Sequence, residues 1–367
     1  MAYITSLRLT DFRSYAALDL TLDHGPIVLF GPNGAGKTNL LEAVSLLSPG
    51  RGLRRAPPDR LAHTVDGNVQ PAWGINAMTD RDQRISVGQV PENPRRRVLR
   101  LDGKNATGGD LAKLISVMWL TPAQDRLFSG PASDRRKFLD RFCLAHQPGH
   151  GIASLRFEKA RAERNRLLSD DVDDRGWYDA LEADLAAQGA VIAQNRVETV
   201  IALQAAVDSR DTIFPKSEIT LSGTVEQMCL EDESLDDVEV SYRELLASTR
   251  GQDRRAGRTL IGPHRSDLVV SHIDKAMPAE QCSTGEQKAL LIGLVLAQAR
   301  SLGDRQPILL LDEIAAHLDN IRRAALAEEL HDLGLQVFMT GTDAALFSDF
   351  GPNTQIFRVD DGSLTPI

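Results

Sequence analysis

The feature that most constrains this chain is a phosphate-binding loop near its beginning whose acidic counterparts lie near its other end. Residues 31–38 read Gly-Pro-Asn-Gly-Ala-Gly-Lys-Thr, a complete match to the pattern G-x-x-x-x-G-K-[ST]. The acidic pair Asp312-Glu313 directly follows the apolar run Ile308–Leu311. A nucleotide site split so widely predicts a chain that leaves its core, builds a second lobe and returns to complete the core.

The residues around the loop fit a phosphate cradle. Pro26–Phe30 is an apolar run typical of a buried strand, and the apolar spacing after Thr38 predicts a helix that ends at Pro49-Gly50. Glycines let backbone N–H groups converge on phosphate oxygens at a helix N-terminus. We expect Lys37 to reach the β- and γ-phosphates and the Thr38 hydroxyl to ligate Mg²⁺. The predicted nucleotide-binding residues are Gly31, Pro32, Asn33, Gly34, Ala35, Gly36, Lys37 and Thr38.

The acidic pair complements this loop. Buried strands often end in acids, so Asp312-Glu313 indicates little by itself. With the loop upstream, we expect Asp312 to hold Mg²⁺ through water and Glu313 to orient or deprotonate the attacking water. Two carboxylates at one strand end, facing metal-bridged phosphates, are the arrangement that hydrolysis requires.

A polar turn at Ser283-Thr284-Gly285-Glu286-Gln287 precedes the acidic strand and has two compatible interpretations. The spacing of Ser283 and Glu286 predicts a capping box at the start of a helix. This helix N-terminus is also redundant within one subunit, because the first loop already covers the phosphates. We therefore expect Ser283 to dock on the γ-phosphate held by a second copy of the chain.

Composition and charge limit the compartment and the partners. The chain has 367 residues, 42% of them hydrophobic, enough for about two domains. No run of 18 apolar residues exists, no signal-peptide pattern begins the chain, and its three cysteines are far apart. These features predict a cytoplasmic protein that spans no membrane and has neither a structural zinc nor a disulfide framework.

The net charge of −9 argues against nucleic acid only on average. Acidic residues cluster at Asp170–Asp174 and Glu231–Glu239, whereas basic residues cluster elsewhere, so a local basic patch remains possible. A solvated face is the ordinary alternative for each basic cluster. Because only 5% of residues are aromatic, we expect contacts to the DNA backbone rather than stacking on bases. The DNA-contacting candidates are Arg54, Arg55, Arg95, Arg96 and Arg97.

The chain pattern predicts an α/β core with a helical insertion. Three regions follow: residues 1–145 as the first part of the core with the loop, 146–256 as a helical arm, and 257–367 as the part that completes the core. In the first part, hydrophobic alternation predicts strands at Ile4–Phe12, Ala17–Leu22, Ile85–Val90 and Val98–Leu101, with a hairpin turn at Gly103-Lys104-Asn105.

The arm and the last part have different textures. Ile152–Leu168 and about Trp177–Asp208, interrupted only by Gly189, predict a short helical hairpin. Strands are predicted at Ser217–Gly223 and Val238–Tyr242, followed by a polar stretch, Thr249–Arg258. In the last part we expect a buried helix at Glu286–Leu302 and buried strands at Ile308–Leu311 and Val337–Thr340.

The motifs together resemble those of ABC-type ATPases of the SMC class, and more narrowly those of a bacterial DNA replication and repair protein of that class. The resemblance covers both ends of the core, and the helical middle matches only in length and texture. It implies an α/β fold: an ABC-type ATPase head assembled from both chain ends, with an inserted helical hairpin lobe. The matching segments are the loop, the signature turn, Asp312-Glu313, Ala316–Asp319, Leu9–Tyr15, Thr38–Ala43, Arg135–Asp140, Gly262–Leu268 and Val337–Asp343.

This resemblance implies a weak ATPase that uses ATP and Mg²⁺ and forms a homodimer on ATP binding. The dimer is expected to bind DNA and to work with recombination mediator proteins in loading recombinase at gaps, with slow hydrolysis resetting it. By position, Arg13 would lie near the phosphates, Gln124 would contact magnesium and water, and Asp319 would sense the opposite subunit. Lys37, Ser283, Asp319 and Glu313 then form the catalytic set.

Two departures from the family pattern matter. Thr342 stands where many such ATPases have a switch histidine, and the signature turn lacks the second glycine of the transporter form. The main alternative function is the ATPase subunit of an ABC transporter, which predicts a shorter insert than the one between Gln124 and Ser283. An ATPase-nuclease would need an acidic metal domain after Glu313, where only a short segment follows. A full structural SMC protein would need longer arms and a hinge.

Overall fold

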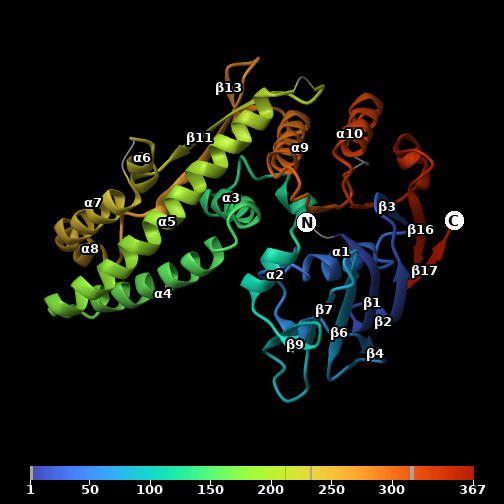
Figure 1. Cartoon of the computed structure of the whole chain (residues 1–367), viewed down its shortest axis with the longest axis horizontal. Helices are drawn as coiled ribbons and strands as arrows, with labels where there is room; N and C mark the ends of the chain where they lie inside the picture. Colours follow the sequence, from blue (N-terminus) through green and yellow to red (C-terminus); the bar gives the residue numbers. More distant parts are fainter. Residues whose placement is uncertain (1–2, 211, 232–233, 315–317) are drawn as a thin grey trace. The chain divides into compact units, whose positions relative to one another are not determined.

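The computed structural model describes residues 3–210, 212–231, 234–314 and 318–367 (Figure 1). The chain divides into two compact units. We call Met1–Asp125, Asp211–Phe214 and Leu291–Ile367 the head, and Arg126–Arg210 with Pro215–Leu290 the lobe. The main boundaries thus fall at 125/126 and 290/291, where the sequence pattern predicts 145/146 and 256/257. Residues 316 and 317 of the family resemblance lie outside the described residues.

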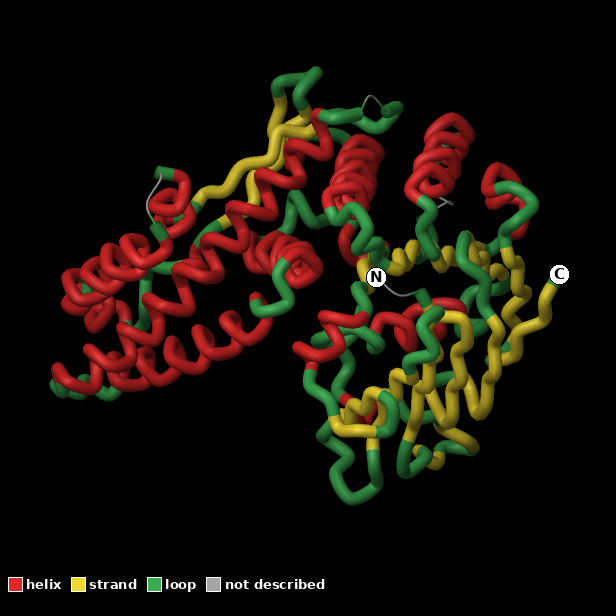
Figure 2. Tube along the Cα trace, in the orientation of Figure 1, coloured by secondary structure: helices red, strands yellow, loops and turns green. Residues whose placement is uncertain are grey.

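The head contains two six-stranded sheets among its described residues (Figure 2). The first is antiparallel throughout, in the order β2-β1-β6-β7-β8-β9. Its strands are β1 (Ile4–Phe12), β2 (Tyr15–Thr21), β6 (Trp73–Thr79), β7 (Arg84–Gln89), β8 (Arg97–Leu101) and β9 (Lys104–Asn105). The strands β6 and β7 alternate fully buried residues with less buried ones, as expected where one face of a sheet covers the core.

The second sheet has the order β10-β14-β15-β3-β16-β17 and is parallel except for its last strand. Every residue of β14 and β15 is buried, which confirms the buried strands expected there. The strands are β10 (Val117–Leu120), β14 (Ile308–Leu311), β15 (Val337–Gly341), β3 (Pro26–Phe30), β16 (Gln355–Asp360) and β17 (Ser363–Pro366). Helix α1 (Lys37–Ser45) shares one hydrophobic core with residues of both sheets, including Leu40, Ile75 and Leu310.

One buried side chain joins the two ends of the chain inside the head. The Gln336 Oε1 accepts a hydrogen bond from the Ile4 backbone N–H at 3.0 Å, and its Nε2 donates to the Ile4 carbonyl at 2.7 Å. The same Nε2 donates to the Asp23 carbonyl at 3.0 Å. Residues separated by most of the sequence therefore form one core, as the split nucleotide motif predicts.

The lobe is mainly helical and is built around the pair α4 (His150–Ser169) and α5 (Arg175–Asp208), which lie side by side and confirm the helical hairpin (Figure 1). The helix α5 runs through Gly189 without a break. Glycine fits this position because a Cβ there would lie 2.5 Å from the Tyr242 ring. Further elements of the lobe include α3 (Ala132–His146), α6 (Thr224–Leu230), α7 (Leu235–Ser248), α8 (Arg250–Ala256), β11 (Ser217–Ser222), β12 (Asp267–His272), β13 (Met277–Pro278) and the start of α9 (Thr284–Ser301). The helix α9 confirms the helix expected at Glu286–Leu302.

Two local predictions were wrong or inexact. Val238–Tyr242 is part of the helix α7, not a strand; Val238, Tyr242 and Leu246 are buried at a spacing of four, and Ser234 caps the helix. The alternation within five residues was too short to reveal this longer period. The hairpin of β8 and β9 exists, but its turn is Asp102-Gly103, both with positive φ, and Lys104 already pairs with Leu101.

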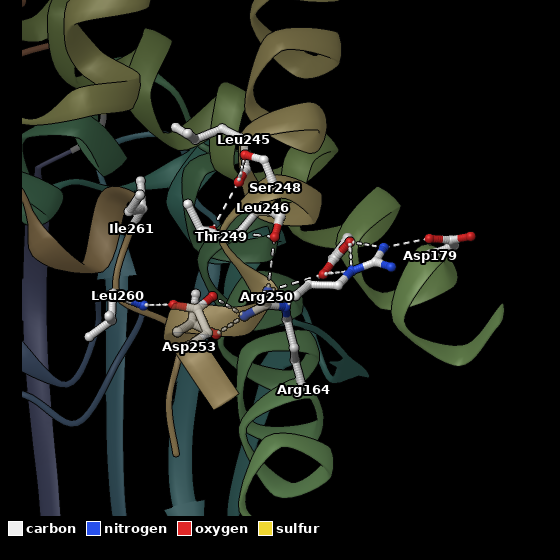
Figure 3. A network of polar contacts seen from close by, with 12 residues as sticks. Arg164, Asp179, Leu245, Leu246, Ser248, Thr249, Arg250, Asp253, Leu260 and Ile261 are labelled. Carbon is white, nitrogen blue, oxygen red and sulfur yellow. Dashed lines mark hydrogen bonds and ion pairs between the residues drawn. The ribbon is translucent and has the colours of Figure 1, made fainter. Parts of the chain in front are cut away.

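A buried ion network holds the lobe together (Figure 3). Arg164 of α4 is fully buried; its guanidinium donates to Asp253 at 2.7 Å, to the Thr259 hydroxyl at 2.9 Å and to Glu182 of α5 at 3.1 Å. Arg250 also pairs with Glu182 and with Asp179. Because a buried charge is costly unless paired, this network fixes the relative positions of α4, α5 and α8.

Candidate nucleotide-binding site

The parallel sheet of the head gathers the predicted site residues at one edge. The carboxyl ends of β3, β14, β15 and β10 meet there, because these strands are parallel neighbours or lie in the same parallel sheet. The phosphate-binding loop follows β3, Asp312-Glu313 follows β14, and Gln124 follows β10 in the short 3-10 helix Pro122–Gln124. Ligands of open α/β sheets bind at this edge.

The loop has the backbone that a phosphate cradle needs. Gly31, Gly34 and Gly36 all have positive φ, which side chains rarely adopt. A Cβ on Gly31 would lie 2.2 Å from the Val359 carbonyl oxygen, and one on Gly36 would lie 2.6 Å from the Ser14 Oγ. The Tyr15 hydroxyl donates to the Gly36 carbonyl at 2.9 Å. These contacts leave the N-terminus of α1 open for backbone N–H groups to bind an anion.

Lys37 is buried at the start of α1. Its Nζ donates to the carbonyls of Gly31 at 2.7 Å and Pro32 at 2.8 Å. Burial lowers the pKa of Lys37, and the nearby carboxylates of Glu313 and Asp312 oppose that shift. The ammonium therefore lies within the loop that it is predicted to serve.

Thr38 and Asp312 meet across the site. The Thr38 Oγ1 lies 3.0 and 3.3 Å from the two carboxylate oxygens of Asp312. The Thr340 hydroxyl, at the end of β15, donates to the same carboxylate at 2.8 Å. The Asp312 backbone N–H donates to the Leu120 carbonyl at 2.8 Å. Residues from two neighbouring strands and one helix thus fix the position of Asp312.

Glu313 has a backbone that sequence alone does not reveal. Its φ is 54°, a strained value for a residue other than glycine, and its N–H donates to the Thr340 hydroxyl at 2.9 Å. Among the described residues, none donates a hydrogen bond to the Glu313 carboxylate. The Thr340 contact thus holds a half-buried carboxylate beside Asp312 and leaves its oxygens free to accept a proton.

Gln124 and Arg13 make contacts other than those that the family resemblance implies. The Gln124 Oε1 accepts from the Thr121 N–H at 3.1 Å, and its buried Nε2 has no partner among the described residues. As oriented, the amide thus offers a donor, whereas Mg²⁺ requires its oxygen. Arg13 donates to both carboxylate oxygens of buried Glu42 at 2.9 Å. Its guanidinium would have to leave that pair to reach a phosphate.

Ser283 and Asp319 both cap helices. In the lobe, Ser283 and Glu286 form the expected capping box: the Ser283 N–H donates to Glu286 at 3.0 Å, and the Glu286 N–H donates to the Ser283 Oγ at 3.4 Å. Ion pairing with Lys275 and these hydrogen bonds lower the pKa of Glu286 to about 2. In the head, Asp319 accepts from the Arg322 N–H at 2.8 Å at the start of α10 (Asn320–Leu333).

Arginines from two segments of the head, 51–60 and 95–97, lie around the same pocket. Arg51, Arg60, Arg95 and Arg97 line one pocket of about 460 Å³ together with Asp59. None of these four arginines forms an ion pair among the described residues, and the buried Nη1 of Arg97 has no hydrogen-bond partner there. Arg54 instead donates to Asn39 at 2.7 Å and lies 3.5 Å from Glu42, while Arg55 and Arg96 are exposed.

Sequence reasoning missed Thr340, Arg51 and Arg60 as members of these sites. A threonine that ends a buried strand is a usable signal, because it can reach a carboxylate that ends the neighbouring strand. The sequence shows that Arg51 and Arg60 are basic, but it does not indicate that they share a pocket with Arg95 and Arg97. Thr342, at the switch-histidine position, is exposed.

The donor set fits a magnesium-nucleotide complex. A hydroxyl and a carboxylate 3.0 Å apart are the oxygen ligands that Mg²⁺ prefers, and they lie beside a glycine-rich helix N-terminus that favours phosphate. The residues that could hold the metal are Thr38 and Asp312, and those that could bind phosphates are Lys37 and the loop N–H groups.

Comparisons with known proteins agree with this site. The model of the RecF/RecN/SMC N-terminal domain matches residues 3–365. A DNA replication and repair protein RecF from Mesorhizobium japonicum is 50% identical, with 99% of this chain and 98% of that protein covered. RecF from Caulobacter sp. strain K31 is 46% identical over 100% of this chain and 98% of that protein.

A solved structure described as the recombination mediator protein RecF-ATPrS in the RecFOR pathway has a TM-score of 0.86 at 22% identity. It covers 100% of this chain and 98% of that chain, and at this identity it supports the fold alone. Fold, site and family model together define an ATPase head of the ABC type and the SMC class. Within that class, the chain belongs to the RecF family. Among the described residues, no helix is both long and apolar enough to cross a membrane.

Proposed function

We propose that this protein is an ATP-dependent DNA-binding protein of recombinational repair and replication. ATP binding would join two copies into a homodimer that holds DNA in the cytoplasm. With recombination mediator proteins, the dimer would help to load recombinase at gaps, and slow hydrolysis would reset it. The proposal is supported by full-length relatives named DNA replication and repair protein RecF and by the geometry of the head.

The chemistry follows from four side chains, those of Lys37, Thr38, Asp312 and Glu313. Lys37 and the loop N–H groups bind the phosphates of ATP, and the Glu313 carboxylate accepts a proton from water as the water oxygen attacks the γ-phosphorus. The bond from the γ-phosphorus to the bridging oxygen breaks, and ADP and phosphate form. Mg²⁺, when bound at Thr38 and Asp312, would neutralise phosphate charge.

The observation that carries this proposal is the 3.0 Å contact of Thr38 with Asp312, residues from opposite ends of the chain. The test is to measure the ATP hydrolysis rate and the oligomeric state with and without DNA, for the wild type and for Lys37→Met. We expect Lys37→Met to weaken ATP affinity at least about tenfold, since it removes a charge-assisted contact to phosphate. Unchanged affinity would remove the loop from nucleotide binding.

For DNA, the pocket of Arg51, Arg60, Arg95 and Arg97 is the best-supported contact in the head. Its guanidinium groups form no ion pair within the described part of the chain, although Asp59 also lines the pocket, and arginine pairs well with phosphate. Arg54 is a weaker candidate because it is tied to Asn39 and Glu42. A homodimer would present two such pockets, and each would be a local region of positive potential despite the net charge of −9 of each chain.

This assignment is tested by reversing Arg51 and Arg95 to Glu, with Arg81→Glu/Arg84→Glu as a control of equal charge change outside the pocket. We expect the pocket variant to bind DNA more weakly, with a smaller salt dependence, at unchanged ATP affinity. Each lost phosphate contact should reduce the slope of log affinity against log salt by about 0.9 for duplex DNA. If both variants lose the same affinity, the effect is one of net charge and not of this pocket.

The transporter alternative is not supported. The matching family model is that of the RecF/RecN/SMC N-terminal domain, and the relatives are named DNA replication and repair protein RecF. Both match the chain over nearly its whole length.

A further inference from the structure

A second basic pocket lies entirely within the lobe. Its volume is about 530 Å³, inside the range of roughly 300–1,000 Å³ typical of ligand sites, and residues of α3, α4, α5 and segment 258–265 line it. Positive side chains outnumber carboxylates in its lining. The basic residues are Arg136, Lys137, Arg161, Arg196, Arg258 and Arg265, and the acidic residues are Asp140 and Glu158.

Part of this positive charge is neutralised. Ion pairs join Arg196 to Asp140 and Glu226, Arg161 to Glu158, and Lys137 to Asp134. By contrast, Arg136, Arg258 and Arg265 form no ion pair among the described residues. Burial, followed by the like charge of Arg196, lowers the pKa of Arg136, although the carboxylates of Asp267 and Asp140 oppose that shift.

The loop that carries Arg265 is held from several sides. Gly262 has a φ of 140°, and a Cβ there would lie 2.1 Å from the Tyr242 hydroxyl. The Arg196 Nη1 donates to the Pro263 carbonyl and to the Ser266 hydroxyl, both at 2.7 Å. Backbone and side-chain contacts thus fix the loop on α5 and α7.

Two arginines of α3 complete this support. The Arg136 Nη1 donates to the Ser266 carbonyl at 2.7 Å, and Arg135 forms two hydrogen bonds, of 2.8 and 2.7 Å, with the Asp267 carboxylate. The segments Arg135–Asp140 and Gly262–Leu268, conspicuous in the sequence, are therefore partners. A buried ion network does not by itself indicate a gain in stability. We therefore assign these contacts the role of fixing the position of the loop that carries Arg265. They present Arg265, which is exposed, beside Arg258 and Arg136.

His264 does not add to the charge of the pocket near neutral pH. Burial is the main reason that its pKa falls to about 4, and its Nε2 donates to the Thr259 carbonyl at 3.0 Å. The ring is therefore neutral and fixes the loop. The excess positive charge comes from arginines, whose planar guanidinium groups match phosphate oxygens in pairs.

We propose that this pocket binds the phosphate group of a nucleotide, with Arg136, Arg258 and Arg265 as its charged contacts. The nucleotide is either free or part of a DNA strand, and only the second source rests on the DNA binding proposed above. The site involves lobe residues alone, so it is separate from the ATP site and from the arginine pocket of the head.

The test uses the full chain carrying Lys37→Met together with Arg51→Glu/Arg95→Glu, which weakens phosphate binding at both head sites. Calorimetric titrations at low salt would use inorganic phosphate, thymidine 5′-monophosphate, and a short oligothymidylate with and without a 5′-phosphate. We expect Arg258→Ala/Arg265→Ala to weaken binding at least about tenfold, the loss typical of charge-assisted contacts. The control Arg243→Ala/Arg255→Ala removes the same charge from exposed lobe positions and should change affinity less than about twofold.

The probe that binds identifies the source of the phosphate group. Thymidine monophosphate binding indicates a free nucleotide, binding of only the 5′-phosphorylated oligonucleotide indicates a strand end, and equal binding of both oligonucleotides indicates backbone phosphates. Unchanged thermal midpoints would show that the variants are folded. The proposal is overturned if no phosphate probe binds, if control and pocket variants lose equal affinity, or if only an acidic peptide such as oligoglutamate binds. Those results leave ATP turnover by the wild-type head untouched, so the two proposals fail separately.

Discussion

The head and the lobe use different kinds of side chain to join segments that are far apart in the sequence. In the head, apolar strands from both chain ends form a core, and polar groups lie at the edge of the sheet where Thr38 and Thr340 hold Asp312. In the lobe, arginines lie within the core itself: Arg164 and Arg196 each bind carboxylates from distant segments. Apolar burial tolerates similar residues, whereas a buried arginine requires its specific partners.

Because of this difference, we expect substitutions at the head site to affect activity and substitutions of the buried lobe arginines to affect stability. Head residues at the sheet edge can change without exposing the core, so their substitution should alter chemistry first. In the lobe, Arg164 and Arg196 are almost fully buried, so their substitution should alter folding first. The predictions below test that division.

The largest effect is expected for Glu313→Gln in the head. Turnover of ATP should fall by about 10²–10⁴, because the amide cannot take the proton of water, while ATP binding persists and the dimer accumulates. The measurement is the steady-state hydrolysis rate together with ATP affinity and sedimentation. Glu328→Gln, at an exposed position of α10, is the matched control. Near-normal hydrolysis in Glu313→Gln would exclude Glu313 as the general base.

In the lobe, Arg164→Met should lower the free energy of unfolding by about 3–5 kcal/mol, because Asp253 and Glu182 remain buried with a lost partner. Chemical denaturation followed by circular dichroism measures this loss. The control is Arg166→Met on the same helix, whose surface pair with Glu163 contributes at most about 1 kcal/mol. Equal losses in the two variants would contradict the division between the lobe core and its surface.

Ser283 lies in the lobe yet is proposed to act on a partner's nucleotide. Ser283→Arg should weaken the ATP-dependent dimer at least about tenfold, while ATP binding by the monomer stays intact, because the bulky cation would occupy the γ-phosphate position. Ser283→Ala should remove only the helix cap, at about 1 kcal/mol of stability. Sedimentation with ATP separates the two results. A normal dimer in Ser283→Arg would leave Ser283 as a helix cap alone.

The effect that is smallest near neutral pH is a pH dependence that belongs to the lobe. The pKa of His264 is lowered from 6.5 to about 4 in the folded protein, so between these values the unfolded chain binds a proton that the folded one does not. Stability from this residue is unaffected above pH 6.5 and decreases as the pH falls toward 4. Thermal midpoints should therefore fall less steeply over this window in His264→Gln than in the wild type. Parallel pH profiles would show that His264 does not titrate in this way.

The sequence predicted the head better than the lobe, for a physical reason. The loop at residues 31–38 and Asp312-Glu313 are contiguous signatures, and their strands are short apolar runs that pattern reveals directly. The position of Thr340 was missed because its role depends on strand order. The partners of Arg164 and Arg196 come from separate segments, and nothing in their spacing indicates the pairing. Val238–Tyr242 was misread because its helical period extends to Leu246.

The hydrogen bonds of Gln336 to Ile4 and Asp23 have a consequence for the order of events during synthesis. The strand β3 pairs with β15 and β16, so β3 must wait for the last part of the chain to leave the ribosome, whereas β1 pairs with the early strands β2 and β6. Every residue of the lobe has been synthesised once residue 290 has emerged. At about 5–20 residues per second, β3 waits on the order of seconds after that point. Nascent chains should therefore acquire a protease-resistant lobe while β3 is still open to chaperones.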